Sequence, residues 1–279
     1  MNFEPDDGKN PDFTGRFDGR HRRILARAGR LFPYNALVNW SEDVCDGITI
    51  MRPSDAPPGV IVAFSGRGLA PEEEPTPTPY LARRFSRALG LDGMPIHWAQ
   101  QVHGNDVVAL REPIARGEAR GAGHCDVLVT PLTGTAVVVQ SADCVPILLA
   151  APGVIGAAHA GWRGSAKNTA GAAVRALEAL GASPATLKAW IGPAIGACCY
   201  EVGGDVAAQF AGDFVRRGCG GGFMLELRAA NVAQLEAAGI PRESIRVHPA
   251  CTKCGGEKYA SYRRDGPRAG RMISLITRL

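Results

Sequence analysis

Three side chains that can bind a metal ion or act as nucleophiles stand at the ends of short apolar segments. Cys144 precedes an apolar run, and His159 follows a run of small and branched residues. His103 ends the segment Ala-Gln-Gln-Val-His and is followed by glycine. Two imidazoles and one thiolate give three protein ligands, and catalytic zinc sites have three such ligands with a fourth position open. These three residues are therefore a candidate metal-binding set.

The spacing of the three residues leaves their chemistry open. A hairpin turn at residues 151–153 would place Cys144 opposite His159 across an antiparallel strand pair. Their separations along the chain match no short zinc-finger pattern. The same residues also fit a buried cysteine with two structural histidines. A third interpretation is a metal-free amide hydrolase in which Cys144 is the nucleophile and His159 its base.

The segments that must position these residues alternate between short strands and helices. Ser165 predicts the N-cap of a long helix that runs to residue 180 and ends at Gly181. The other predicted helices are 80–89, about 204–217 and 228–238, and the predicted strands are 96–101, 106–110, 126–130, 135–140, 145–150, 154–158, 187–191, 244–248 and 272–277. Strands predominate early and helices late. This order predicts an α+β fold, with central mixed β-sheets flanked by helices in a single domain.

The composition is that of a globular protein. Of the 279 residues, 46% are apolar and 21% are charged, which excludes a disordered chain. The net charge of +4 suits an anionic small molecule but falls short of the clustered charge of a nucleic-acid binder, so we expect no nucleic-acid partner. No apolar run approaches the ~18 residues that span a membrane, so we expect no membrane partner.

The N-terminal region differs from the rest of the chain. Residues 1–30 are polar with a basic cluster, and they predict a flexible extension ahead of one catalytic domain over residues 31–279. The first ten residues contain no apolar run typical of a signal peptide. We therefore expect a cytoplasmic protein whose eight cysteines are reduced or metal-bound. We also expect the chain to act as a monomer.

Five motifs occur in one order along the chain and carry a family resemblance. They are Gln-Val-His-Gly at 101–104, Ala-Asp-Cys-Val-Pro at 142–146, Ala-His-Ala-Gly-Trp-Arg-Gly at 158–164, Ile-Gly-Pro-Ala-Ile-Gly at 191–196, and a tail with Cys-Thr at 251–252 and Ser-Tyr-Arg-Arg-Asp-Gly at 261–266. Over about residues 60–279, the chain closely resembles the YfiH-like family labelled polyphenol oxidase or laccase-domain proteins. Its members are regarded as purine nucleoside phosphorylases with adenosine deaminase activity.

The resemblance implies a ligand set, a cofactor and substrates. It implies zinc at His103, Cys144 and His159, with purine nucleosides (adenosine, inosine and methylthioadenosine) and phosphate as partners. Copper is a weaker alternative, because the additional centres of an oxidase would need many more histidines than the six present. A non-catalytic binding protein of the same fold is a further alternative, since the family's Thr-Arg-x-Gly-Gly-x-Ser segment is altered around Arg67.

The matched motifs indicate roles for neighbouring side chains. Asp143 is a candidate general base on water, or a partner that orients a ligand histidine. Arg67 and Arg163 are candidates for binding phosphate through paired hydrogen bonds. Trp162 is a candidate for stacking on a purine, although packing would also explain it. The backbone amides of residues 192–196 form a candidate anion nest or a simple tight turn.

The remaining cysteines and arginines of these motifs predict structural roles. Adjacent cysteines cannot easily reach one metal ion, so we expect the pair at 198–199 to be buried. The Cys-x-x-Cys motif at 251–254 has no second such pair, so we expect no zinc site there. Arg271 and the Arg-Arg-Asp sequence at 263–265 predict structural ion pairs.

Overall fold

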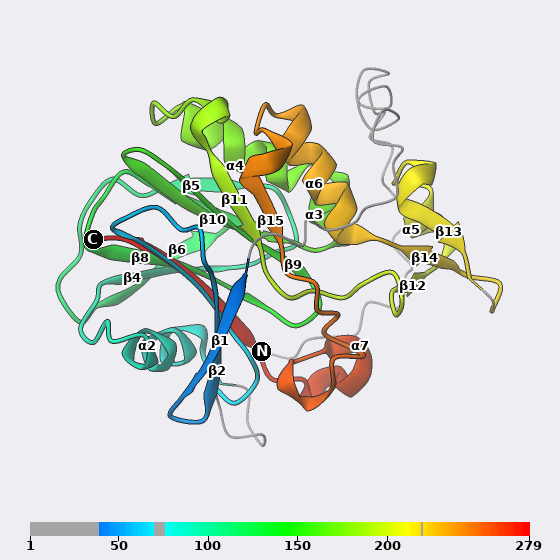
Figure 1. Ribbon diagram of the computed structural model, residues 1–279, viewed down its shortest axis with the longest axis horizontal. Coiled ribbons are helices and arrows are strands. Elements are labelled where there is room, and N and C mark those ends of the chain that lie inside the picture. The colour runs from blue at the N-terminus through cyan, green and yellow to red at the C-terminus, as the bar shows by residue number, and fades with distance from the viewer. Residues whose placement is uncertain (1–38, 70–75, 219) are drawn as a thin grey trace.

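Two stacked β-sheets form the centre of the structure, a computed structural model that describes residues 39–69, 76–218 and 220–279 (Figure 1). The seven-stranded sheet has, in spatial order, β1 (Trp40–Cys45), β2 (Ile48–Pro53), β3 (Val60–Ser65), β16 (Met272–Arg278), β8 (Thr135–Ser141), β4 (Ile96–Gln100) and β6 (Ala119–His124). The six-stranded sheet has β15 (Ile245–Val247), β11 (Lys188–Ile191), β9 (Val145–Ala151), β10 (Val154–Ala160), β7 (Val127–Thr130) and β5 (Val107–Ala109). A small third sheet contains β12 (Glu201–Val202), β14 (Phe223–Leu225) and β13 (Val215–Arg217).

Alternate residues of the central strands explain why the two large sheets stack. In β8, Val137 packs between the sheets, whereas Val138 faces the opposite side. In β9, Leu148 packs between the sheets, and Ile147 and Leu149 face the other way. Successive side chains of a strand point to opposite faces, so strands that are buried on both faces read as continuous apolar runs. These runs are the ones that predicted strands in the sequence.

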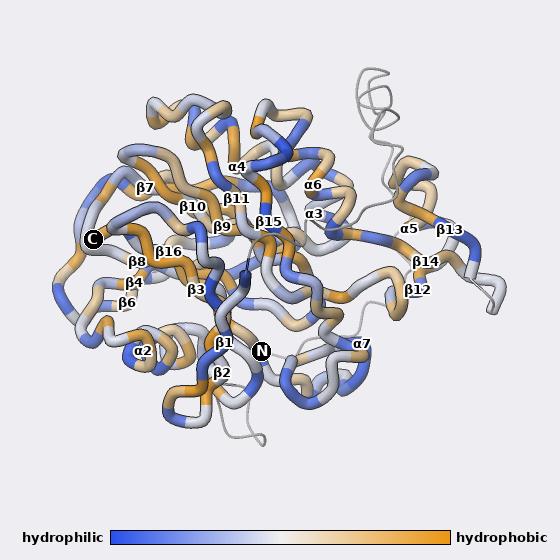
Figure 2. The backbone as a smooth tube through the Cα atoms, viewed as in Figure 1, coloured by the Kyte–Doolittle hydropathy of each residue, from blue (hydrophilic) through white to orange (hydrophobic). Residues whose placement is uncertain are grey.

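Helices cover the two outer faces of the stacked sheets. α2 (Thr78–Ala88) packs on the seven-stranded sheet through Leu81 and Phe85. α4 (Thr169–Glu178) and α6 (Leu227–Ala237) pack on the outer face of the six-stranded sheet. Figure 2 shows the hydrophobic residues concentrated along the central strands. The shorter helices are α3 (Trp162–Ala166), α5 (Gly204–Ala207) and α7 (Tyr262–Asp265). The predicted α+β fold, with mixed sheets flanked by helices in a single domain, is confirmed.

The long helix predicted from Ser165 is in fact two helices. Asn168 has a φ of 64°, a left-handed conformation that interrupts the helix, and its side chain caps α4 by accepting a hydrogen bond from the amide of Gly171. The hydroxyl of Ser165 instead accepts a hydrogen bond from Asn231 of α6. Ser165 therefore joins two helices rather than capping one.

The helix predicted over residues 204–217 is also wrong. The segment contains only the short helix α5 and a single 3-10 turn at Gly212–Phe214, and its end forms β13, because pairing with β14 provides the backbone hydrogen bonds that a helix would have provided. The extension predicted at residues 1–30 lies outside the described residues. Within the described ranges, no helix is long and apolar enough to cross a membrane.

The packing between the sheets generates a stability prediction. Leu148 is fully buried there, so Leu148→Ala should lower the free energy of unfolding by about 2–5 kcal/mol through lost contacts and a residual cavity. Leu279→Ala is the matched control, because the side chain of Leu279 is 62% exposed and should change stability by less than about 0.5 kcal/mol. Urea unfolding followed by circular dichroism measures both, and equal stabilities would contradict this packing.

Candidate active site

The hairpin of β9 and β10 brings Cys144 and His159 together. The two strands are antiparallel with Val145 opposite Ala160, so Cys144, directly before β9, lies beside the end of β10. His103 lies in the turn that follows β4. The donor atoms of Cys144, His103 and His159 all lie within 4.8 Å of one another. The structure therefore brings together the three residues, called the ligand set below, and they can hold one metal ion.

The buried carboxylate of Asp126 supports both histidines of the ligand set. Its Oδ1 lies 2.8 Å from Nδ1 of His159. The same carboxylate accepts hydrogen bonds from the backbone amides of Val102, His103 and Gly104, at 3.2, 3.1 and 2.6 Å. Because Nδ1 of His159 is engaged, Nε2 is the atom of that ring available to a metal. Sequence reasoning missed Asp126, whose only signal was a carboxylate placed directly before an apolar strand.

The backbone around the ligand set is shaped to admit the donor atoms. A Cβ atom built on Gly161 would lie 2.8 Å from Nδ1 of His103 and 3.1 Å from Sγ of Cys144, so any other residue there would displace these donor atoms. His103 has a φ of 57° and Asp143 a φ of 91°. Residues other than glycine rarely adopt this region, and such strain is concentrated at functional sites.

Charge is separated within the site. Burial raises the pKa of the Cys144 thiol, but His159 and His103 outweigh burial and lower that pKa to about 6. Burial lowers the pKa of His159, but Cys144 and Asp126 outweigh it and raise that pKa to about 9. Burial would also raise the pKa of Asp126, yet its hydrogen bond with His159 keeps it below the ordinary value. In the metal-free protein, Cys144 and His159 therefore form a thiolate–imidazolium pair near neutral pH.

Asp143 does not orient the histidines. One of its carboxylate oxygens accepts a hydrogen bond from the hydroxyl of Thr252 at 2.5 Å, and the other accepts one from the amide of Arg263 at 2.6 Å. The interpretation of Asp143 as a partner of His159 is wrong, because Asp126 occupies Nδ1 of that ring. Asp143 instead connects the loop that carries Cys144 to the segments before and within α7.

Of the three residues predicted to bind substrate, Trp162 and Arg163 lie on α3 and Arg67 lies in the loop after β3. Trp162 of α3 packs against the hydrophobic core, and the guanidinium of the exposed Arg163 lies over its ring, 4.4 Å from the centroid. Arg67 lies against α7, with its Nη1 3.9 Å from Oδ2 of Asp265. These contacts support the interpretation of Trp162 as a packing residue. Arg67 and Arg163 remain candidates for binding an anion.

Arg271 departs from its predicted role in an ion pair. Its guanidinium donates to the backbone carbonyls of Ala269 and Gly270, and among the described residues it forms no ion pair. Burial lowers the pKa of Arg271, while the charges of Cys144 and Asp143 act in the opposite direction. The guanidinium therefore lies within electrostatic range of the ligand set and is a further candidate for binding an anion.

Of the two other predictions for this region, the anion nest is wrong and the ion pair is confirmed. The turn at residues 192–196 is not an anion nest, because the amides of Gly192, Ile195 and Gly196 already donate to two backbone carbonyls and to a cysteine sulfur. The ion pair predicted within residues 263–265 is present, with Nη2 of Arg264 2.8 Å from Oδ2 of its neighbour.

Known proteins share both sequence and fold with this chain. The model of the family described as multi-copper polyphenol oxidoreductase laccase matches residues 73–279. A purine nucleoside phosphorylase from Xylella fastidiosa is 38% identical over 203 residues, which cover 69% of this chain and 75% of that protein. An adenosine deaminase from an unknown prokaryotic organism is 36% identical over 204 residues, which cover 68% of this chain and 78% of that protein. The crystal structure of YlmD from Geobacillus stearothermophilus matches with a TM-score of 0.70 and 30% identity, over 82% of this chain and 96% of that one.

The ionisation of Cys144 generates a prediction about its reactivity with pH. In chelator-treated protein, alkylation of Cys144 by iodoacetamide should rise through about pH 6 and level off above it, because the thiolate is then fully formed. Free cysteine, with a pKa of about 8.5, continues to gain reactivity up to alkaline pH and serves as the reference. Peptide mass spectrometry measures the rate at this residue. His159→Gln should move the profile to higher pH, and an unchanged profile would contradict the pairing.

Proposed function

The chain belongs to the multi-copper polyphenol oxidoreductase laccase family, and on that premise we propose that it is a zinc-dependent purine nucleoside phosphorylase. The proposed substrates are adenosine, inosine or methylthioadenosine together with phosphate, and hydrolytic deamination of adenosine is proposed as a second activity. The observation that carries the proposal is the convergence of His103, Cys144 and His159. Relatives at 36% and 38% identity are named for these two activities, which supports it.

The chemistry of the ligand set fits a single zinc ion. Two imidazoles and one thiolate match catalytic zinc sites that keep one position open. Asp126 holds His159 from behind, as carboxylates do for zinc-bound histidines. A multi-copper oxidase would need further histidine clusters, and in the described part of the chain the other metal-binding group contains only cysteines. Zinc, when bound, supplies a Lewis acid that stabilises negative charge as it develops on an oxygen or a leaving group.

Phosphorolysis needs a group that binds phosphate, and the arginines near the site are the candidates. A phosphate oxygen attacks C1′ of the ribose while the C1′–N9 bond breaks, and the electron pair of that bond moves to the purine. Arg271 is a candidate to hold the phosphate, because its charge interacts with that of Cys144 and it forms no ion pair among the described residues. Arg67 and Arg163 are further candidates, and Trp162 is a candidate for contact with the base.

Deamination needs groups that move a proton near the base. Water adds to C6 of adenine and ammonia leaves, so one proton must be transferred to the leaving amine. Asp143 is the candidate acid–base residue, because it is buried beside Cys144 and its carboxylate is held by Thr252. Burial and the charge of Cys144 raise the pKa of Tyr200. Its phenol therefore stays protonated and can donate a hydrogen bond to substrate.

A metal-free thiol hydrolase is the second candidate function. Cys144, His159 and Asp126 form a thiolate, an imidazolium and a carboxylate in sequence, with the last two joined at 2.8 Å. Cysteine hydrolases use this order of nucleophile, base and orienting group. In that mechanism His103 would not bind a metal, and the enzyme would hydrolyse amide bonds of its substrate.

Cys144→Ser separates the two candidate functions. A serine hydroxyl stays protonated near neutral pH and is a poor zinc ligand, so this variant should lose the zinc ion of the ligand set. Phosphorolysis and deamination should fall together by about 10³-fold or more, because one metal serves both reactions. Elemental analysis and chromatography of products from adenosine and inosine, with and without phosphate, provide the measurements.

The outcomes of this experiment are distinct. Cys45→Ser is the matched control, since Cys45 lies at the end of β1 outside the ligand set, and it should keep both zinc and activity. A zinc content in Cys144→Ser equal to that of the wild type, with lost activity, would show that Cys144 acts as a nucleophile and not as a ligand. Phosphorolysis that survives while deamination disappears would show that the two reactions use different centres.

Asp126→Asn tests the support behind the ligand set. Loss of the negative charge should weaken the hold on His159 and on the turn of His103, and zinc affinity should fall by about 10–100-fold. Asp106→Asn is the control, because it removes the same charge from a nearby but exposed side chain that makes no hydrogen bond to either histidine. Competition titration with a chromogenic chelator measures both affinities. Equal affinities in the two variants would refute the positioning role of Asp126.

A further inference from the structure

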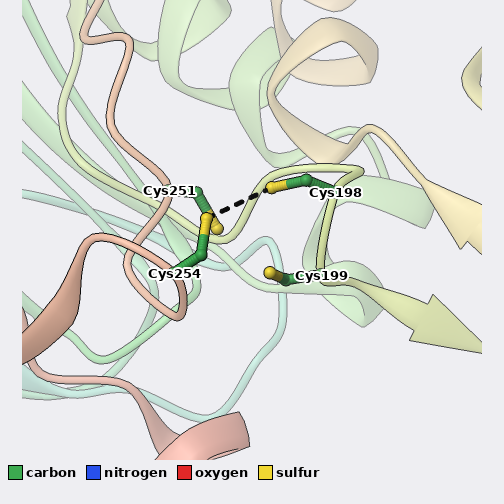
Figure 3. A group of neighbouring side chains, drawn as sticks. All are labelled: Cys198, Cys199, Cys251 and Cys254. Atoms are coloured by element: carbon green, nitrogen blue, oxygen red, sulfur yellow. Dashed lines mark hydrogen bonds between the residues drawn. The ribbon is translucent and has the colours of Figure 1, made fainter.

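Four cysteines from two separate turns meet beside the active site, and they are called the four-cysteine cluster below. Cys198 and Cys199 lie in the turn after β11, and Cys251 and Cys254 lie in the turn after β15 (Figure 3). The expectation that the adjacent pair is buried is wrong, because Cys198 is exposed and Cys199 is half-buried. Both adjacent thiols point toward the other two cysteines. They therefore supply the second pair that the Cys-x-x-Cys motif lacks in the sequence.

The spacing of the sulfur atoms fits a tetrahedral metal site. All four sulfurs lie within 4.8 Å of one another, and Sγ of Cys198 is 3.6 Å from Sγ of Cys254. Four thiolates at about 2.3 Å from one zinc ion form a tetrahedron with edges of about 3.8 Å. The cluster thus needs a contraction of about 1 Å at most to reach that geometry. A disulfide would hold its two sulfurs at about 2.0 Å, much closer than the 3.6 Å between Sγ of Cys198 and Sγ of Cys254.

Hydrogen bonds hold the Cys251 turn in position around the cluster. The amide of Gly196 donates to Sγ of Cys251 at 3.3 Å, a contact that orients a ligand sulfur. The amide of Thr252 donates to the carbonyl of Ala194 at 3.1 Å, which fixes the two turns side by side. The guanidinium of Arg264 donates to three carbonyls within and just after the Cys251 turn. The ligands are therefore largely preorganised.

A buried arginine, Arg228, lies beside the cluster and is also paired with Glu226, with its Nε 3.0 Å from Oε1 of that residue. Four thiolates and one zinc ion carry a net charge of −2, which a nearby cation stabilises. A Cβ atom built on Gly196 would lie 2.8 Å from Nη2 of Arg228 and 3.4 Å from Sγ of Cys198. The guanidinium and the thiol therefore flank the same glycine. Arg228 also donates to the three carbonyls that precede Cys251.

We propose that the four-cysteine cluster binds one structural zinc ion, separate from the ligand set of the active site. Each thiol binds as a thiolate and releases its proton to solvent. Four protein ligands close the coordination sphere, so this ion has no open position for substrate. The exposed Cys198 and Cys254 provide the path by which the ion enters. This inference does not depend on the proposed catalytic activity.

The proposed ion would brace the active site from outside. Thr252 lies between two of the ligands and donates its hydroxyl to Asp143. The turn of Cys198 is connected to the same residue, because the amide of Ile195 donates to the carbonyl of Asp143 at 2.9 Å. Zinc in the four-cysteine cluster would therefore lock together the two turns that hold Asp143 beside Cys144.

Metal stoichiometry tests the proposal. The full chain is purified without chelator, exchanged into metal-free buffer, and analysed for zinc. We expect about two zinc ions per wild-type chain and about one in the double variant Cys198→Ser/Cys254→Ser. Cys45→Ser should keep the wild-type content. Equal zinc content in the wild type and the double variant would overturn the proposal, as would iron in place of zinc.

X-ray absorption on His103→Ala gives a test that needs no cysteine variant. This variant should lose the zinc of the ligand set and retain one ion surrounded by four sulfurs at about 2.3 Å. A mixed nitrogen and sulfur environment would overturn the proposal. If the ligand set binds no zinc at all, the wild type should contain about one ion and the cysteine double variant none, so failure of the proposed function is distinguishable.

Thiol titration tests the redox alternative, in which Cys198 and Cys254 form a disulfide. In protein prepared without reductant and then unfolded with chelator, all eight cysteines should react. A disulfide between Cys198 and Cys254 would remove two of these thiols from the count, and that result would replace the zinc site with an oxidised cross-link.

Discussion

The carboxylate of Asp126 connects the two histidine-bearing segments of the candidate active site. A charge buried at this depth is unfavourable unless donors surround it, and here the ring of His159 and three successive amides of the His103 turn provide them. The turn of His103 also depends on this carboxylate. The three amides of the turn point to the carboxylate while His103 keeps a left-handed backbone conformation. The ligand set is therefore complete only when β7, β10 and the segment after β4 are all in place.

The pairing of β9 with β10 determines the position of the Cys144 thiol. β9 and β10 are buried along their whole length, so a shift of one residue in their pairing would turn each apolar face toward the wrong layer. That cost fixes Cys144 at the start of one strand beside the end of the other. The two left-handed residues of the site, His103 and Asp143, lie outside the strands, and Gly161 lets the ring of His103 and the sulfur of Cys144 approach each other.

Particular residues show how far the sequence alone leads. Two apolar runs with a short turn between them predict the β9–β10 hairpin, and with it the approach of Cys144 to His159. Asp126 could not be found in this way, because one aspartate before an apolar strand has no periodicity and its partners come from distant segments. The four-cysteine cluster depends equally on tertiary structure, since only the folded chain places the turn after β11 beside the turn after β15. The helix predicted over residues 204–217 failed because strand pairing overrode local propensity.

The place of β16 in the seven-stranded sheet affects how the protein can be synthesised. β16 lies between β3 and β8, so β3 has no partner on that side until residues 272–278 have left the ribosome. At about 5–20 residues per second, translation of the roughly 200 intervening residues takes about 10–40 s. Throughout that interval the nascent chain carries an unpaired apolar strand edge, the feature that promotes aggregation between neighbouring polypeptides on one messenger RNA. Completion of this sheet is therefore a late event of biosynthesis.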